Sequence, residues 1–279
     1  MAKDEGARLG TNQSVERAIA VLKAFADRGR ALRVGEVALL CGLGTSTTSR
    51  LLATLVAEGM IERSDSGSYQ LGPEVITLAG VALNHSQLAR EARQVAYEVA
   101  STTSLGANVA ERRDNRVFYL VHFDGAMAPR AYTLLGRRSP LHATGLGKAL
   151  ISELPPEEHA RLLGKPPWDA YTPHTATQPD QMERELAVIR QRGYATEREE
   201  LAFGRGCVSA PIRGRDGRVV AAISVSGPLS ALRLEARERE LARTVIEAAD
   251  RIGAAIGASP QIRSSPPDIP ALDGHRRSV

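Results

Sequence analysis

Histidine and cysteine are the residue types in this 279-residue chain that first suggest metal or nucleophilic chemistry. The six histidines include no pair at i, i+4 spacing, so the helical zinc-binding pattern of metalloproteases is absent from the sequence. A site assembled from His122, His142 and Cys207 stays open as an alternative, although isolated histidines are more often structural. Cys207 falls in an expected strand, and we interpret it as a small buried apolar residue rather than a nucleophile. We therefore expect no metal and no cofactor.

The run Gly145-Leu146-Gly147-Lys148 invites comparison with the phosphate-binding loop of nucleotide-binding proteins. The comparison fails, because Ala149 stands where serine or threonine is required and His142 stands where the first glycine belongs. No serine lies in a G-x-S-x-G pattern either. The sequence thus holds no complete catalytic motif, and we predict that the chain has no catalytic residues.

Residues 32–63 have the periodicity of a helix, a glycine turn, a second helix and a strand. The first helix is predicted over about 34–41, and Gly42 can leave it with a positive φ at little cost. Thr45 or Ser46 is a good N-cap for the second helix. One face of that helix is small or cationic, so it can approach base edges while its N-terminal amides meet phosphates. The pattern predicts a DNA-binding helix-turn-helix; a helical hairpin in some other small domain is the alternative.

Residues 60–71 follow as two short strands around a Ser-Asp-Ser-Gly tip, which is typical of a wing. A third helix is predicted over 14–27, capped by Ser14. Charge supports DNA binding only weakly, because residues 1–76 hold nine Lys or Arg and nine Asp or Glu. Arg28 and Arg30 are expected on the side of the residues predicted to contact DNA, which are Arg33, Thr45, Ser46, Thr47, Thr48, Ser49, Arg50 and Arg63.

The length is sufficient for two domains. After a connecting helix that begins at Pro73, hairpin patterns at 106–121 and 207–226 alternate with helical patterns, which predicts an antiparallel α+β sheet. A further strand is expected over 130–134. The predicted organisation is a flexible N-terminus over 1–13, a DNA-binding domain over 14–73, a linker helix over 74–86, a second domain over 87–258 and a disordered, proline-rich tail over 259–279.

Cellular location is indicated by what the sequence does not contain. Cys41 and Cys207 are too few for a disulfide framework, which suits a reducing cytoplasm. The N-terminal residues are polar, and no stretch approaches the ~18 apolar residues of a membrane span. We therefore expect a cytoplasmic protein with no membrane partner.

Ordered motifs connect the two predicted domains to a known family. Across residues 14–257 the chain resembles the IclR family of bacterial transcriptional regulators. The N-terminal motifs are Glu16-Arg17-Ala18, Glu36-Val37-Ala38, Ser46-Thr47 with Arg50-Leu51-Leu52, and Tyr69-Gln70-Leu71-Gly72. The later motifs are Pro140-Leu141-His142-Ala143-Thr144-Gly145 with Gly147-Lys148-Ala149, Arg192-Gly193-Tyr194, Cys207-Val208-Ser209-Ala210-Pro211, and Ile223-Ser224-Val225-Ser226-Gly227.

The resemblance implies a mixed fold, with an all-α winged helix-turn-helix domain joined by a linker helix to a GAF/profilin-like α+β effector-binding domain. It implies a homodimer or homotetramer that binds a double-stranded DNA operator and a small organic effector, such as an organic acid, an aromatic or a sugar-derived compound. It favours a repressor over an activator. Two positions depart from the family pattern: Gly44-Thr45 replaces a usual Pro-Lys pair, and Ser49 replaces a frequent histidine.

The family's effector pocket carries over to six residues of this chain. A helix N-terminus near Thr144 offers amides to a carboxylate, and serines two apart on a strand share one face. A glutamate in the pocket would accept from a hydroxyl and repel a second carboxylate. The alternative is that the two serines only face solvent. The predicted effector-binding residues are Gly145, Leu146, Glu197, Cys207, Ser224 and Ser226.

Two other classes of function remain as alternatives. One is an enzyme that metabolises a small acid and uses its N-terminal module for assembly; the lack of a catalytic motif disfavours it. The other is a pure interaction module, which the wing and the hydroxyl-rich helix disfavour. We therefore predict a ligand-responsive, DNA-binding transcriptional regulator.

Overall fold

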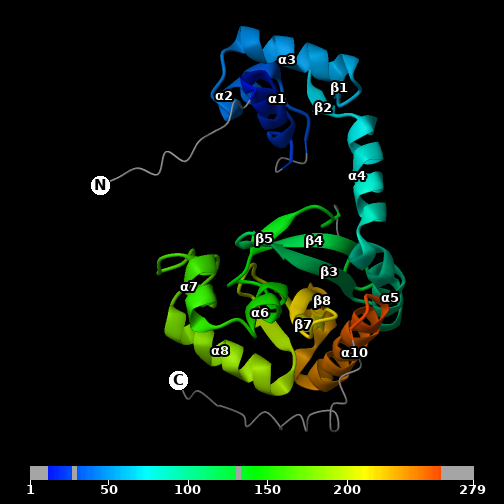
Figure 1. The fold of residues 1–279 in the computed structure, drawn as a ribbon, viewed down its shortest axis with the longest axis vertical. Coiled ribbons are helices and arrows are strands. Elements are labelled where there is room, and N and C mark those ends of the chain that lie inside the picture. The colour runs from blue at the N-terminus through cyan, green and yellow to red at the C-terminus, as the bar shows by residue number, and fades with distance from the viewer. Residues whose placement is uncertain (1–11, 27–29, 130–132, 259–279) are drawn as a thin grey trace. The chain divides into compact units, whose positions relative to one another are not determined.

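The computed structural model describes residues 12–26, 30–129 and 133–258, and the chain divides into two compact units (Figure 1). The first unit is Met1–His85 and the second is Ser86–Val279. Each unit has its own hydrophobic core. The predicted tail over 259–279 and most of the predicted flexible N-terminus lie outside the described residues.

The first unit is a helical domain with one small hairpin. Three helices surround a core to which the hairpin contributes Ile61. Helices α2 and α3 meet at 109°, an angle typical of helix-turn-helix pairs, and Gly42 makes the turn between them with φ 63°. The elements are α1 (Gln13–Lys23), α2 (Val34–Cys41), α3 (Thr45–Ala57), β1 (Ile61–Arg63), β2 (Tyr69–Leu71) and α4 (Pro73–His85).

Two helix starts differ from the prediction. Helix α1 begins one residue earlier than expected, because the side chain of Asn12 accepts hydrogen bonds from the amides of Ser14 and Val15. Helix α3 has Gly44 as its N-cap and no side-chain cap, so the expected cap at Thr45 or Ser46 is wrong. The hydroxyls of Thr45 and Ser46 are therefore not needed as caps and stand at the exposed first turn.

The second unit is a six-stranded antiparallel sheet with the order β5-β4-β3-β8-β7-β6. Helices α5 and α10 pack against each other and against the sheet, whereas α6 packs against β6, β7 and β8 and against α8. Strand β8 is buried on both alternating faces, as expected for a sheet covered twice. The strands are β3 (Gly106–Arg113), β4 (Arg116–Phe123), β5 (Arg138–Pro140), β6 (Ala195–Arg198), β7 (Arg205–Arg213) and β8 (Val219–Pro228). The helices are α5 (Gln87–Thr103), α6 (Gly145–Ile151), α7 (Pro156–Leu163), α8 (Pro179–Arg192), α9 (Leu229–Leu232) and α10 (Leu234–Ala255).

The predicted fold class is confirmed, and one strand is placed differently. The strand expected over 130–134 falls partly on residues 130–132, which lie outside the described residues. Strand β5 instead lies at Arg138–Pro140, where three residues are too few to give a pattern. No single helix of the described residues could cross a membrane; α2 and α3 reach the required length and hydropathy only as a bent pair.

Candidate effector cavity and DNA-binding surface

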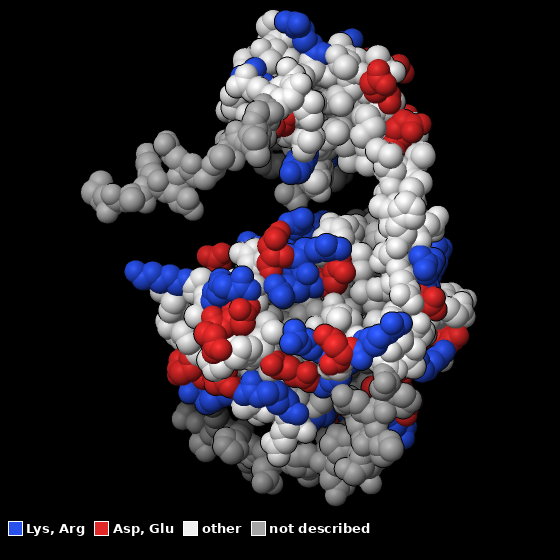
Figure 2. All heavy atoms as spheres, in the orientation of Figure 1, with Lys and Arg blue, Asp and Glu red and all other residues white. Residues whose placement is uncertain are grey.

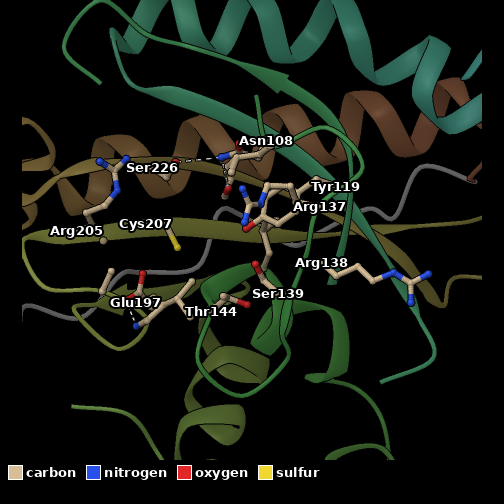
Figure 3. Close-up of a pocket in the computed structure, with 16 residues that line it drawn as sticks. Asn108, Tyr119, Arg137, Arg138, Ser139, Thr144, Glu197, Arg205, Cys207 and Ser226 are labelled. Atoms are coloured by element: carbon tan, nitrogen blue, oxygen red, sulfur yellow. Dashed lines mark hydrogen bonds between the residues drawn. The ribbon is translucent and has the colours of Figure 1, made fainter. Parts of the chain in front are cut away.

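A cavity of about 250 Å³ opens between the sheet of the second unit and the start of α6 (Figure 3). Strand register explains why distant residues meet there. Ser224 lies opposite Asn108 on β3, and Ser226 lies opposite Cys207 on β7. Because residues two apart on a strand share a face, the two serines line the same wall.

Asn108 holds both serines in place. Its Nδ2 atom donates to Ser224 Oγ at 3.2 Å and to Ser226 Oγ at 3.1 Å, and its Oδ1 atom lies 2.8 Å from Nδ1 of His122. Ser224 is 1% exposed and Ser226 is 9% exposed, so the alternative in which they only face solvent is wrong. Sequence reasoning missed Asn108, although a lone polar residue within an apolar strand was a usable signal.

Glu197 is the only carboxylate among the described residues that line the cavity. Its Oε1 atom accepts the amide of Glu200 at 2.7 Å, and burial raises its pKa above the ordinary value. Burial also raises the pKa of the neighbouring Cys207 thiol to about 12. Cys207 is therefore a thiol at neutral pH, which removes the nucleophile alternative.

The start of α6 differs in detail from the prediction. Leu146 and Thr144 line the cavity, but Gly145 does not. A Cβ at Gly145 would lie 2.6 Å from Cys207 Sγ, so this glycine is what allows α6 to approach β7 closely. Thr144 Oγ1 already accepts the amide of Gly147 at 3.0 Å, which leaves fewer helix amides for a ligand than expected.

Three arginines that the sequence analysis did not identify also line the cavity. Arg205 lies two residues before Cys207 on β7 and therefore faces the same side. Figure 3 shows Arg137 beside Tyr119 and Asn108, whereas the guanidinium of Arg138 points away from that group. Arg138 instead lies 3.9 Å from the carboxylate of Asp114. The lining thus carries more positive than negative charge, which suits an anionic ligand.

Lys148, which suggested a phosphate-binding loop, is a structural residue. Its side chain is 1% exposed, and its Nζ lies 2.7 Å from Glu185 and 2.5 Å from Glu200. Burial disfavours the charge, but the two carboxylates outweigh burial and raise the pKa of Lys148. Burial raises the pKa of Glu200 to about 7, although Lys148 opposes that shift. The neighbouring carboxylate of Glu185 also raises the pKa of Glu200.

The residues of the alternative metal site are separated. His142 lines a different cavity, where its Nε2 lies 2.9 Å from the carbonyl oxygen of Asp169. His122 is held by Asn108, and Cys207 lines the first cavity. Within the described ranges, no group of three or more His, Cys, Asp or Glu side chains could hold a metal ion.

Helix α3 presents most of its hydroxyl-rich face to solvent. Thr45, Ser46, Ser49 and Arg50 are exposed, and Thr47 is half-buried. Thr48 is fully buried and its Oγ1 donates to the carbonyl of Gly44 at 3.1 Å, so its assignment to the DNA-facing set is wrong.

The arginines expected around α3 have mixed surroundings. Arg33 and Arg63 are exposed, and the guanidinium carbon of Arg63 lies 5.8 Å from the centroid of the Tyr69 ring. Arg30 is paired with Glu36 at 2.7 Å, so its charge is partly neutralised. Arg28 lies outside the described residues.

A winged helix-turn-helix unit followed by an α+β unit with a small polar cavity defines a DNA-binding transcriptional regulator that responds to a ligand. Residues 14–65 match the IclR helix-turn-helix domain, and residues 80–254 match the bacterial transcriptional regulator IclR C-terminal domain. The chain belongs to the IclR family. Its relatives are named as regulators and repressors rather than as enzymes.

Individual relatives match over most of their length. The HTH-type transcriptional regulator XynR of Escherichia coli is 32% identical over 77% of this chain and 85% of its own. The glycerol operon regulatory protein of Streptomyces coelicolor is 32% identical over 88% and 97%. Among solved structures, an IclR transcriptional regulator from Alicyclobacillus acidocaldarius is 26% identical with a TM-score of 0.78, covering 89% of this chain and 100% of that one.

Proposed function

We propose that the chain regulates an operon for the metabolism of a small organic acid, acting in the cytoplasm as a homodimer or homotetramer. Repression is the proposed sign, with activation as the alternative. Related regulators point to such operons: the acetate operon repressor of Salmonella typhimurium is 29% identical over 90% of this chain. An IclR homologue from Microbacterium hydrocarbonoxydans, 26% identical over 88% of this chain and 100% of its own with a TM-score of 0.74, was solved with 4-hydroxybenzoate.

The effector proposed for the first cavity is a hydroxy monocarboxylate. The observation that supports it is the charge of the lining, which combines three arginines with a single buried carboxylate. Arg137 and Arg205 would hold the ligand carboxylate, because guanidinium groups match its geometry. Glu197 would accept a hydrogen bond from a ligand hydroxyl and would repel a second carboxylate.

Glycerate should raise the melting temperature of the wild-type chain, whereas uncharged glycerol at the same concentration should not. The stabilisation follows from ligand binding to the folded state alone. Arg137→Gln combined with Arg205→Gln should abolish the shift, whereas Arg138→Gln, whose guanidinium points away, should retain it. A shift of equal size with glycerol, or one that survives the double substitution, would remove the proposed anion site. Thermal-shift assays of the full chain measure all four cases.

Operator contact is proposed for the exposed face of α3, with Arg50 as its only cation and Arg33 and Arg63 beside it. The short side chains of Thr45, Ser46, Thr47 and Ser49 would allow the helix to enter the major groove.

Arg50→Ala should weaken binding to a duplex selected in vitro against the wild-type chain by about ten- to a hundredfold, the range of a lost base contact. Lys23→Ala, which removes an exposed cation from α1, serves as the matched control and should change affinity little. Fluorescence anisotropy gives both affinities, and circular dichroism verifies that each variant is folded. An Arg50→Ala variant that binds like the control would contradict the assignment of α3.

A further inference from the structure

A second cavity of about 240 Å³ lies in the second unit, and it shares no lining residue with the first. We propose that this cavity binds a small aromatic monocarboxylate. The segment between the two cavities is short: Arg138 and Ser139 line the first, whereas Pro140, Leu141 and His142 line the second. The inference does not depend on the effector proposed for the first cavity.

One wall of the second cavity is an aromatic cluster. The ring centroid of His142 lies 5.8 Å from that of Trp168 and 5.9 Å from that of Tyr171. His142 and Trp168 are buried, whereas Tyr171 is 39% exposed and stands at the surface. Planar rings stack on such clusters with a gain beyond the area they bury. Tyr171 is therefore the ring of this wall that offers its surface to a flat aromatic ligand, and the buried His142 and Trp168 support it from behind.

The aromatic wall is fixed in place before any ligand arrives. Trp168 Nε1 donates to the carbonyl of Gly164 at 3.1 Å. His142 Nε2 lies 2.9 Å from the carbonyl of Asp169, and because a carbonyl can only accept, Nε2 carries the proton. A wall whose side chains are already ordered loses little conformational entropy on binding.

Arg116 and Lys165 are the groups of this cavity that attract an anion. Both line the cavity, and no hydrogen bond or ion pair of either side chain occurs among the described residues. Arginines nearby differ, since Arg138 lies close to Asp114 and Arg161 is paired with Glu158 at 2.5 Å. Two cations without a carboxylate partner at one cavity offer charge-assisted hydrogen bonds to a ligand carboxylate.

Asp169 limits the ligand to one negative charge. It is the only carboxylate among the described residues that line this cavity, and it would repel a second anionic group. An aromatic dicarboxylate is thereby disfavoured relative to benzoate. The lining thus specifies three properties of the ligand: a flat ring, a single carboxylate and a small size.

Trp168 makes the proposal directly measurable, because it is the only tryptophan in the chain and it lines this cavity. Titration of the full chain with benzoate, with excitation at the red edge of tryptophan absorption, should give a saturable change in emission. Benzamide, which keeps the ring but not the charge, and acetate, which keeps the charge but not the ring, should each bind at least about tenfold more weakly.

Paired variants identify where benzoate binds. Arg116→Gln combined with Lys165→Gln should weaken benzoate binding by about tenfold or more, and a folded variant is expected because Lys165 is exposed and Arg116 is half-buried. Arg137→Gln combined with Arg205→Gln, in the first cavity, should leave the fluorescence titration unchanged. The proposal would be overturned if benzamide bound as tightly as benzoate, or if the Arg116→Gln, Lys165→Gln double variant kept the wild-type affinity for benzoate. Loss of the fluorescence change in the first-cavity variant would also overturn it.

Discussion

Replacing Lys148 with methionine is expected to destabilise the second unit by about 3–5 kcal/mol, the usual cost of removing one partner of a buried ion pair. The methionine fills a similar volume but leaves the carboxylates of Glu185 and Glu200 facing each other without the ammonium they share. Glu200 is buried and would have to keep a proton or ionise without a partner. Chemical denaturation followed by circular dichroism measures the change.

The size of that loss should depend on pH. In the wild-type chain the pKa of Glu200 is about 7, above its ordinary value of 4.5. A group with a raised pKa in the folded state adds stability that is present below its unfolded pKa and is lost as pH rises through the folded value. Without Lys148 the pKa of Glu200 rises further, so the penalty of the variant should be smaller near pH 5 than near pH 8.

A double variant separates the buried charge from simple packing. Lys148→Met combined with Glu200→Gln should recover part of the lost stability, because no uncompensated charge remains in the interior. Lys165→Met, at an exposed lysine, should change stability by only about 0.5 kcal/mol or less. A Lys148→Met variant as stable as the Lys165→Met control at pH 8 would show that the buried ion pair contributes nothing.

The elements of this fold were predictable from local patterns. The helix-turn-helix, its wing and the hairpins of the second unit each depend on periodicity or turn residues within about ten positions. Boundaries were less predictable, as at Asn12, where a side chain two residues ahead of the expected cap makes the first hydrogen bonds. Strand β5 was missed because three residues paired only with a neighbouring strand carry no pattern of their own.

The cavity was only partly predictable, because its interactions join residues far apart in the sequence. Asn108 bonds to Ser224 across 116 positions, and Lys148 bonds to Glu200 across 52. No local pattern encodes such pairings. Thr48 and Gly145 show the same limit within single helices, where the sequence indicated only the helix face. Thr48 is buried and cannot contact DNA, and Gly145 packs closely against β7 and does not line the cavity.

Helix α4 has the composition of a buried helix and the exposure of a surface one. None of its residues is buried, and Ile76, Leu78 and Val81 are 76%, 57% and 50% exposed. Figure 2 shows the helix as an almost uncharged surface. An isolated helix of 13 residues is marginal in water, so such a helix is normally stabilised by packing. We propose that α4 of a second copy of this chain covers these residues in the homo-oligomer.

Ile76→Glu combined with Val81→Glu should therefore dissociate the proposed homo-oligomer and weaken operator binding by about a hundred- to ten-thousandfold. The large factor arises because a dimer delivers its second recognition helix at high effective concentration, whereas a monomer binds one half-site at a time. Glutamate has good helix propensity, so α4 should persist. Sedimentation gives the oligomeric state and fluorescence anisotropy gives the affinity.

The matched control is Gln87→Glu, which places one new negative charge at an exposed position of α5. It should leave both assembly and DNA affinity unchanged, because it introduces charge without removing apolar surface. If the α4 variant kept the oligomeric state of the wild-type chain, the helix would not be the interface. If it became monomeric yet bound DNA like the wild-type chain, the coupling of two half-sites would be wrong. If the variant dissociates and also loses affinity, the exposed apolar residues of α4 hold two copies together so that their two recognition helices bind both half-sites at once.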